Sequence, residues 1–168
     1  RVSLRLKDYQ KSSEYLQRGI SLLRKARNKG LLAEAALQEA EFELETGEID
    51  PALKTCERTL GEIRELGMKL LEARGQRILG RIVTAQQRFA EAEMHLRESV
   101  ALAQRYRGEY EKALALKSLA EMYRLQPGMK RSPRLFQSNL SKAISIFRQL
   151  GAEIDLSQCT QMLTSPDS

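Results

Sequence analysis

Small and apolar residues recur along this chain with a period of 40 positions, and this period limits the fold more than any other feature. The recurring sets are Ser12, Ala52 and Ala92; Leu16, Cys56 and Leu96; Gly19, Thr59 and Ser99; Ile20, Leu60 and Val100; Ala33, Ala73 and Ala113; and Ala40, Gly80 and Ala120. Two antiparallel helices approach closely only where small residues meet, while larger apolar residues fill the layers between helix pairs. The period therefore predicts a stack of similar two-helix units.

Within each unit the apolar residues are spaced as in amphipathic helices, three or four positions apart. β-Branched residues are sparse and strong helix formers dominate, which argues against strands. Breaks fall at Gly30, Gly67, Gly151, the Pro- and Gly-rich residues 126–133, and an N-cap Asp50 followed by Pro51 at the first helical position, with weaker breaks at Gln87-Arg88 and Arg107-Gly108. We predict eight helices, at residues 8–28, 32–46, 50–66, 69–87, 89–107, 109–125, 135–150 and 152–164.

Several of these positions carry a pattern that resembles the tetratricopeptide-repeat family. The matching segments are Asp8-Tyr9 with Ser12 and Leu16; Arg88-Phe89 with Ala92, Leu96 and Ser99; Leu79-Gly80; Leu119-Ala120; and Ala143 with Phe147. The resemblance implies an all-α, right-handed superhelical stack of antiparallel helix hairpins, an α-solenoid. We expect one domain over 1–168, with units at 8–28 (half), 32–66, 69–107, 109–150 (with a loop at 126–134) and 152–164 (half).

The period exceeds the family's usual repeat of about 34 residues, because the second helices are longer. The segment 147–152 is similar to the long-helix repeats of large bacterial signalling proteins, where such repeats accompany ATPase, cyclase or transcription-activator domains. The sequence also lacks an initiating Met. We therefore expect it to be part of a larger protein.

The net charge of +6 is distributed unevenly. Residues 1–30 hold nine basic and two acidic groups, whereas residues 31–67 hold three basic and ten acidic groups. A uniformly basic nucleic-acid binder would not contain that acidic block. The N-terminal basic group, made up of Arg18, Arg24, Lys25, Arg27 and Lys29, is expected to contact the acidic helix at 32–46 or solvent.

No apolar run approaches the roughly 18 residues needed to cross a membrane, so we expect no membrane association. Cys56 and Cys159 lack partners at metal-ligand spacing and are expected to be reduced, buried thiols of a cytoplasmic protein.

The sequence carries no convincing catalytic group, and we expect a protein that is not an enzyme and needs no cofactor or metal. His95 is the only histidine, which excludes histidine-rich metal sites and catalytic triads. Its neighbours Glu91 and Glu93 are interpreted as solvated helix-face residues. The glutamates at 39, 41, 43 and 45 would spread around a helix rather than converge on a cation. Gly80 is attributed to close helix packing.

The clearest polar pattern is a basic strip on the first helices of the predicted hairpins. Arg74, Arg77 and Arg81 fall on one helix face, and Lys117 lies one period after Arg77. The family resemblance places these residues, with Arg124, along the concave groove of such stacks. Guanidinium groups grip carboxylates, so the strip is a candidate site for an acidic peptide, a C-terminal carboxylate or an acidic surface. The alternative is a solvated face balanced by Glu72, Glu109 and Glu121.

In the first complete hairpin the same groove positions are Glu34, Leu37, Glu41 and Leu44, so a partner crossing the whole groove would carry charge of both signs. We predict a protein-interaction module, regulatory or scaffolding in a multidomain bacterial signalling protein, that binds an acidic or mixed-charge protein or peptide.

The alternatives are a small-molecule sensor using Tyr106, Tyr110 and Tyr123, and a nucleic-acid-binding repeat. The second is disfavoured because aromatics make up only 5% of residues and Trp is absent. The unfinished terminal hairpins could also support self-association.

Overall fold

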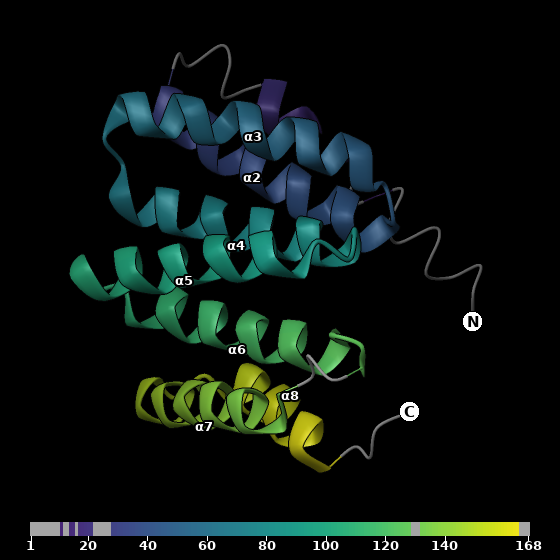
Figure 1. Cartoon of the computed structure of the whole chain (residues 1–168). Helices are drawn as coiled ribbons and strands as arrows, with labels where there is room; N and C mark the ends of the chain where they lie inside the picture. The colour runs from purple at the N-terminus through teal and green to yellow at the C-terminus, as the bar shows by residue number, and fades with distance from the viewer. Residues whose placement is uncertain (1–10, 12–13, 16, 22–27, 129–131, 165–168) are drawn as a thin grey trace. The chain divides into compact units, whose positions relative to one another are not determined.

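The computed structural model describes residues 11, 14–15, 17–21, 28–128 and 132–164, and within these ranges it is helical without any β-strand (Figure 1). Its complete helices are α2 (Lys29–Thr46), α3 (Ile49–Leu66), α4 (Lys69–Ala85), α5 (Phe89–Arg105), α6 (Glu109–Leu125), α7 (Pro133–Leu150) and α8 (Glu153–Thr164). The all-α prediction is confirmed for this part of the chain. The predicted helix at 8–28 lies largely outside the described residues, and those described between 11 and 21 are helical.

The chain divides into two compact units, Arg1–Gly67 and Met68–Ser168, whereas one domain over residues 1–168 is expected from the sequence. The boundary falls at Gly67, which the sequence marks as a helix end.

In the first unit, α2 and α3 pack together as a hairpin. The contact uses the small residues of the 40-residue period: Ala33, Ala40, Ala52, Cys56 and Thr59 are all buried. A side chain of one to three heavy atoms beyond Cα lets the two helix backbones come close without leaving a void. The residues that recur every 40 positions are therefore buried in this hairpin, as their spacing predicts.

The start of α2 differs from the prediction. Gly30 does not break the chain but lies in the first turn of α2, which begins at Lys29. The cap is Asn28, whose side chain accepts a hydrogen bond from the backbone N–H of Leu31 at 3.0 Å. An Asn side chain satisfies one of the otherwise unpaired N–H groups of the first turn, so the helix can start before the glycine.

The start of α3 also differs. Glu48 rather than Asp50 is its N-cap residue, and no side chain caps it. Asp50 and Pro51 instead lie inside the first turn of α3. Proline is tolerated there because the first N–H groups of a helix have no partner within the helix, and the Asp50 carboxylate favours the positive end of the helix dipole.

In the second unit, successive helices pack in adjacent pairs, α4 with α5, α5 with α6, α6 with α7 and α7 with α8, and α4 also contacts α6 (Figure 1). One core cluster joins α6, α7 and α8 and consists of Ala113, Leu116, Ala120, Leu140, Ala143, Phe147 and Cys159. Cys56 and Cys159 are both buried and are not joined in a disulfide, as predicted.

The pair α4–α5 shows why the period requires small residues. A Cβ atom on Gly80 would lie 2.6 Å from Cγ of Leu96, a fully buried side chain. Ser99 donates a hydrogen bond across the same interface to the carbonyl oxygen of Ala73 at 2.7 Å. The predicted packing role of Gly80 is confirmed.

The turns follow the same period as the core. Gly47 and Gln87, 40 positions apart, have φ of 87° and 61°, and Gly67 and Arg107, also 40 apart, have φ of 67° and 57°. The residue after each of three such turns bonds back to the preceding helix: Glu48 to Glu43, Arg88 to Val83 and Gly108 to Ala103, at 2.8–2.9 Å. This is the helix-ending motif that glycine usually occupies, and here two non-glycine residues adopt it.

The remaining helix ends lie within two residues of the predictions. α4 and α5 end at Ala85 and Arg105, before the left-handed turn residues. α7 begins at Pro133 because the Ser132 side chain accepts a hydrogen bond from the backbone N–H of Leu135. The loop before α7 is therefore shorter than the predicted 126–134.

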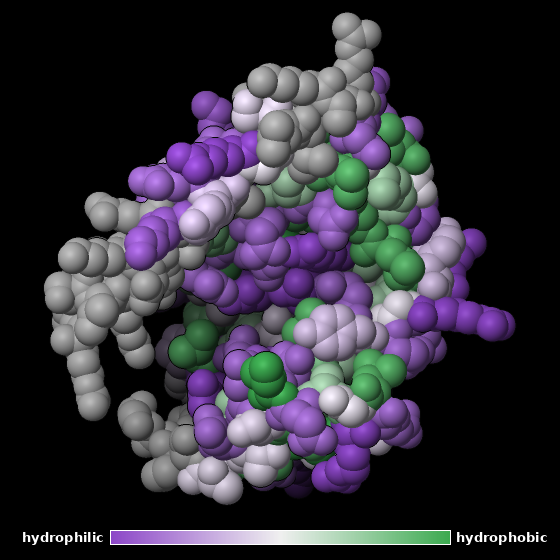
Figure 2. Space-filling model, turned by 180° about the vertical axis from the view of Figure 1, so that it is seen from behind, coloured by the Kyte–Doolittle hydropathy of each residue, from purple (hydrophilic) through white to green (hydrophobic). Residues whose placement is uncertain are grey.

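Figure 2 shows, on the face seen from behind, small hydrophobic groups set among hydrophilic residues. Among the helices of the described residues, none combines the length and apolar character needed to cross a bilayer.

Candidate partner-binding surfaces

The residues of the predicted basic strip all lie in the second unit, on α4 and α6. Arg74, Arg81, Lys117 and Arg124 are partly exposed, whereas Arg77 is only 5% exposed. Because α4 and α6 contact each other, the residues of the strip lie on two neighbouring helices. Whether the strip binds a partner stays a prediction.

Arg77 does not fit the prediction that it faces a partner. Its Nε donates to Oε1 of Glu111 at 2.5 Å, and the two side chains are 6% and 15% exposed. A charge-assisted pair shielded to this degree joins α4 to α6. Arg77 is therefore a brace between two helices, a role that single-helix spacing cannot distinguish from a groove position.

Lys117 is also in contact with the following first helix. Its Nζ donates to Oε1 of Gln158 on α8 at 2.5 Å. Nearby, the Tyr110 hydroxyl donates to Oδ2 of Asp155 at 3.0 Å, and the Tyr110 ring meets Phe147 edge-on, with the ring centroids 5.9 Å apart. Burial, followed by the bond to Asp155, raises the pKa of Tyr110. Polar contacts thus link α4 to α6 and α6 to α8 on this face.

Two of the three acids expected to balance the strip, Glu72 and Glu109, have partners on their own helix. Glu72 pairs with Lys69 at 2.8 Å and Glu109 with Lys112 at 3.4 Å, each within one helix. In the first unit, the proposed groove residue Leu37 is fully buried, so it belongs to the core instead. The period places Leu37 and Arg77 at the same position of their hairpins, and both are buried.

A second surface, which the sequence analysis missed, is a trough over α5, α6 and α7 with a volume of about 400 Å³. Its lining includes the apolar residues Val100, Leu116, Leu119 and Leu135 and the polar residues Arg97, Gln104, Tyr123, Asn139 and Lys142. Of the three tyrosines considered for a small-molecule pocket, only Tyr123 is part of this lining. The long connection between α6 and α7 is the one sequence signal that marks the region.

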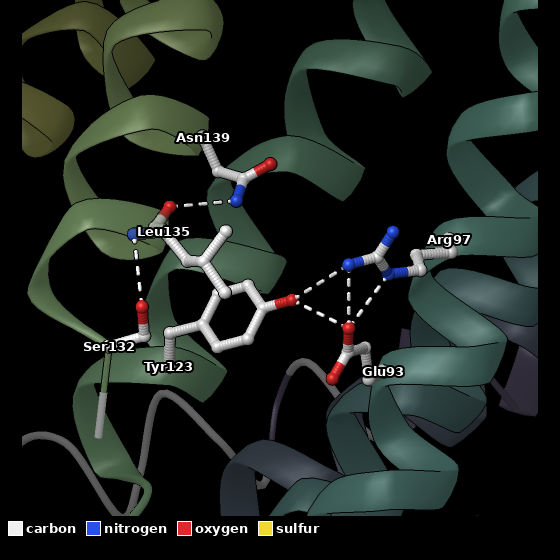
Figure 3. A network of polar contacts seen from close by, with 6 residues as sticks. All are labelled: Glu93, Arg97, Tyr123, Ser132, Leu135 and Asn139. Atoms are coloured by element: carbon white, nitrogen blue, oxygen red, sulfur yellow. Dashed lines mark hydrogen bonds and ion pairs between the residues drawn. The ribbon is translucent and has the colours of Figure 1, made fainter. Parts of the chain in front are cut away.

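A three-residue polar network adjoins the trough: Arg97 and Tyr123 line it, and Glu93 holds both of them from outside the lining (Figure 3). Oε1 of Glu93 accepts from the Tyr123 hydroxyl at 2.8 Å and from Nε and Nη2 of Arg97 at 2.8 and 2.7 Å. Tyr123 is 3% exposed, and burial, then the bond to Glu93, raises the pKa of its hydroxyl. Glu93, interpreted from the sequence as a solvated residue, instead links α5 to α6.

The remaining candidates for chemistry are His95 and Cys159. Nδ1 of His95 lies 2.8 Å from Oε1 of Gln76, and its Nε2 lies 3.8 Å from Oε1 of Glu91. Burial raises the pKa of the Cys159 thiol, which favours the unreactive protonated form. No group of three His, Cys, Asp or Glu side chains that could hold a metal ion occurs in the part of the chain that the structure describes.

Only part of the basic N-terminal group predicted to contact α2 is described by the structure. Arg24, Lys25 and Arg27 lie outside the described residues. Arg18 and Lys29 are exposed. Gln17 donates to Oε1 of Glu39 at 2.7 Å, which links that segment to α2 through a neutral side chain. At the other end of the chain, α8 buries Cys159 and leaves Ile154 76% exposed.

Comparison with known proteins yields a likeness in fold. No family model matches the chain, and no curated protein matches it. Among solved structures it is similar to BtubC (BKLC) from P. vanneervenii, with a TM-score of 0.61 and 18% sequence identity, over 95% of this chain and 74% of that chain. At this identity the likeness concerns the fold alone.

Proposed function

We propose that this chain is a tetratricopeptide-like helical-repeat module that binds a segment of a partner protein on the face formed by the first helices α4, α6 and α8. The observation that carries the proposal is the burial of the 40-residue register: Ala33, Ala73 and Ala113 are all buried, as are Ala40, Ala120 and, by its contact with Leu96, Gly80. Repeated hairpins stacked in this way form extended surfaces whose usual use is recognition.

The charge of the face supports an acidic or mixed-charge partner. Arg74, Arg81 and Arg124 are partly exposed on α4 and α6, with Lys117 beside them and Glu121 among them. Exposed cations steer an acidic segment to the face and fix its register more than they add affinity. The right-handed superhelical arrangement belongs to this proposal, as does a regulatory or scaffolding role in a multidomain bacterial signalling protein.

The test is binding of the chain to an array of acidic and mixed-charge peptides. The variant is Lys117→Glu with Arg124→Glu, since Arg77→Glu would break the brace to Glu111 and confuse folding with binding. The control is Arg105→Glu with Arg148→Glu, which makes the same charge change at exposed residues of α5 and α7. We expect the strip variant to lose about tenfold or more in affinity and the control to bind normally.

Equal binding by both variants, with circular dichroism confirming that both are folded, would contradict the proposed face. Binding of an unrelated single-stranded RNA with a steep loss on adding salt would instead favour the nucleic-acid alternative.

A further inference from the structure

The trough over α5, α6 and α7 is separate from the first-helix face, although α6 contributes to both. Leu116, Leu119 and Tyr123 of α6 line the trough, whereas Lys117 and Arg124 of the same helix belong to the strip. The trough is therefore a second candidate binding surface, formed by the second helices α5 and α7 together with part of α6.

The base of the trough is apolar and its polar lining is cationic. Val100 and Leu135 contribute aliphatic surface, and Leu135 is 39% exposed. Arg97 from α5 and Lys142 from α7 both line the trough, and its lining contains no carboxylate. An occupant that matches this surface combines an aliphatic group with a negative charge.

The two cations are available to such an occupant in different ways. Arg97 is held by Glu93 through Nε and Nη2, while its Nη1 has no partner among the described residues, so the guanidinium is oriented yet has donors left over (Figure 3). Glu93 offsets the charge of Arg97. Lys142, exposed and without a hydrogen-bond or ion-pair partner in the described part of the chain, then supplies the unbalanced positive charge.

The amide groups of the lining indicate the chemical class of the occupant. Nδ2 of Asn139 donates to the carbonyl oxygen of Leu135 at 2.7 Å, which leaves Oδ1 of Asn139 as an acceptor (Figure 3). Gln104 adds a second amide to the lining. Acceptor oxygens need N–H or O–H donors opposite them, and a peptide backbone supplies N–H donors where an alkyl carboxylate has none.

We propose that this trough binds a short peptide segment of a partner protein, with an aliphatic side chain on the apolar base and an Asp or Glu carboxylate between Arg97 and Lys142. The proposal extends the interaction role to a second surface and does not require the first-helix face to bind.

The test uses an array of short acetylated peptides that place Leu and Glu at every spacing on an Ala/Ser background, with a matched array in which Gln replaces Glu. The protein is the full chain, as wild type, Lys142→Glu and the same-helix control Arg148→Glu, which is exposed and absent from the trough lining. We expect Glu peptides to bind wild type and the control alike. Lys142→Glu should weaken them about tenfold, and Gln peptides should bind about tenfold more weakly than Glu peptides.

Equal binding by Lys142→Glu and Arg148→Glu, equal binding of Glu and Gln peptides, or binding of neither array would overturn the proposal. Binding of octanoate with loss in Lys142→Glu, without peptide binding, would assign the trough to a small amphiphile and also overturn it. The strip variant Lys117→Glu with Arg124→Glu separates the two proposals, because it should leave trough binding unchanged.

Discussion

At the residue scale, the backbone of Gly80 lies against the side chain of Leu96, and this contact sets how close α4 and α5 come. Gly61, by comparison, has open space around the position where a Cβ atom would be. Both glycines are inside helices, where glycine by itself costs up to about 1 kcal/mol relative to alanine. The two positions are therefore a matched pair in which only the packing differs.

We expect Gly80→Ala to lower the free energy of unfolding by about 1–2 kcal/mol, because displacing buried Leu96 costs more than the improved helix propensity returns. Gly61→Ala should raise it by about 0.5–1 kcal/mol. Urea denaturation followed by circular dichroism measures both. A gain in stability for both variants would show that α4 and α5 have room at Gly80.

Tyr123 gives a pH dependence whose sign follows from its burial. Its pKa is raised in the folded state, so above about pH 10 the unfolded chain loses this proton first and folding stability falls as pH rises. Tyr123→Phe removes a hydrogen bond to Glu93, which costs about 1 kcal/mol at pH 7. That cost should shrink between pH 10 and 11 when urea midpoints of the two proteins are compared.

The exposed Tyr106→Phe serves as the control and should change stability little at either pH. A Tyr123→Phe cost that is the same at pH 7 and pH 10.5 would show that the hydroxyl is not protected by burial and Glu93.

At the scale of elements, side chains link first helices that are not adjacent in sequence. The Arg77–Glu111 pair bridges α4 and α6, whereas the Arg58–Glu62 pair lies along α3 with side chains that are 59% and 50% exposed. Removing one partner of a shielded pair leaves the other charge desolvated without compensation. An exposed pair is screened by water and contributes little.

Arg77→Met should therefore cost about 2 kcal/mol of unfolding free energy, and the double variant Arg77→Met with Glu111→Met should recover much of it. Arg58→Met should stay within about 0.5 kcal/mol of wild type. Chemical denaturation of the four proteins completes the comparison. Equal losses of unfolding free energy in Arg77→Met and Arg58→Met would show that Arg77 does not stabilise the contact between α4 and α6. Arg77 would then again be a candidate partner-binding residue of the basic strip.

The turns between helices give a further element-scale prediction. Gln87 occupies the left-handed position that Gly47 occupies one period earlier, and a side chain there costs about 1 kcal/mol. Gln87→Gly should raise stability by about 0.5–1 kcal/mol, and Gly47→Gln should lower it by a similar amount. Thermal melting checks both, and a loss of stability in Gln87→Gly would mean that its side chain is needed at the turn.

At the scale of the whole molecule, the second unit holds α4 to α8, and the core cluster of α6, α7 and α8 lies entirely inside it. We expect the fragment 68–168 to fold without residues 1–67, because about 100 residues can bury a sufficient core. Circular dichroism should show a helical spectrum and a cooperative thermal transition. A helical but non-cooperative melt would show that the second unit depends on the first.

The arrangement of helices was largely predictable from the sequence, because the signals are local or periodic. The recurrence of small and of larger apolar residues every 40 positions marked Ala73, Gly80 and Leu96 as core positions. Gly67 and Gly151 marked helix ends. The errors at Gly30 and Asp50 concern caps, where one side-chain hydrogen bond decides the first residue of a helix. Such a bond shifts a boundary by a few residues without changing the fold.

By itself the sequence determined that the described residues form helices and which small residues would meet, since both depend on side-chain size and spacing along one chain. Only the tertiary structure decided which charges face solvent. In the structure Arg77 pairs with Glu111, Glu93 bonds to Tyr123, and the exposed Lys142 lines the trough. These partners lie some 30 residues apart or more, and helix periodicity places a charge on a face without naming what stands opposite, because that depends on how neighbouring helices are rotated and spaced.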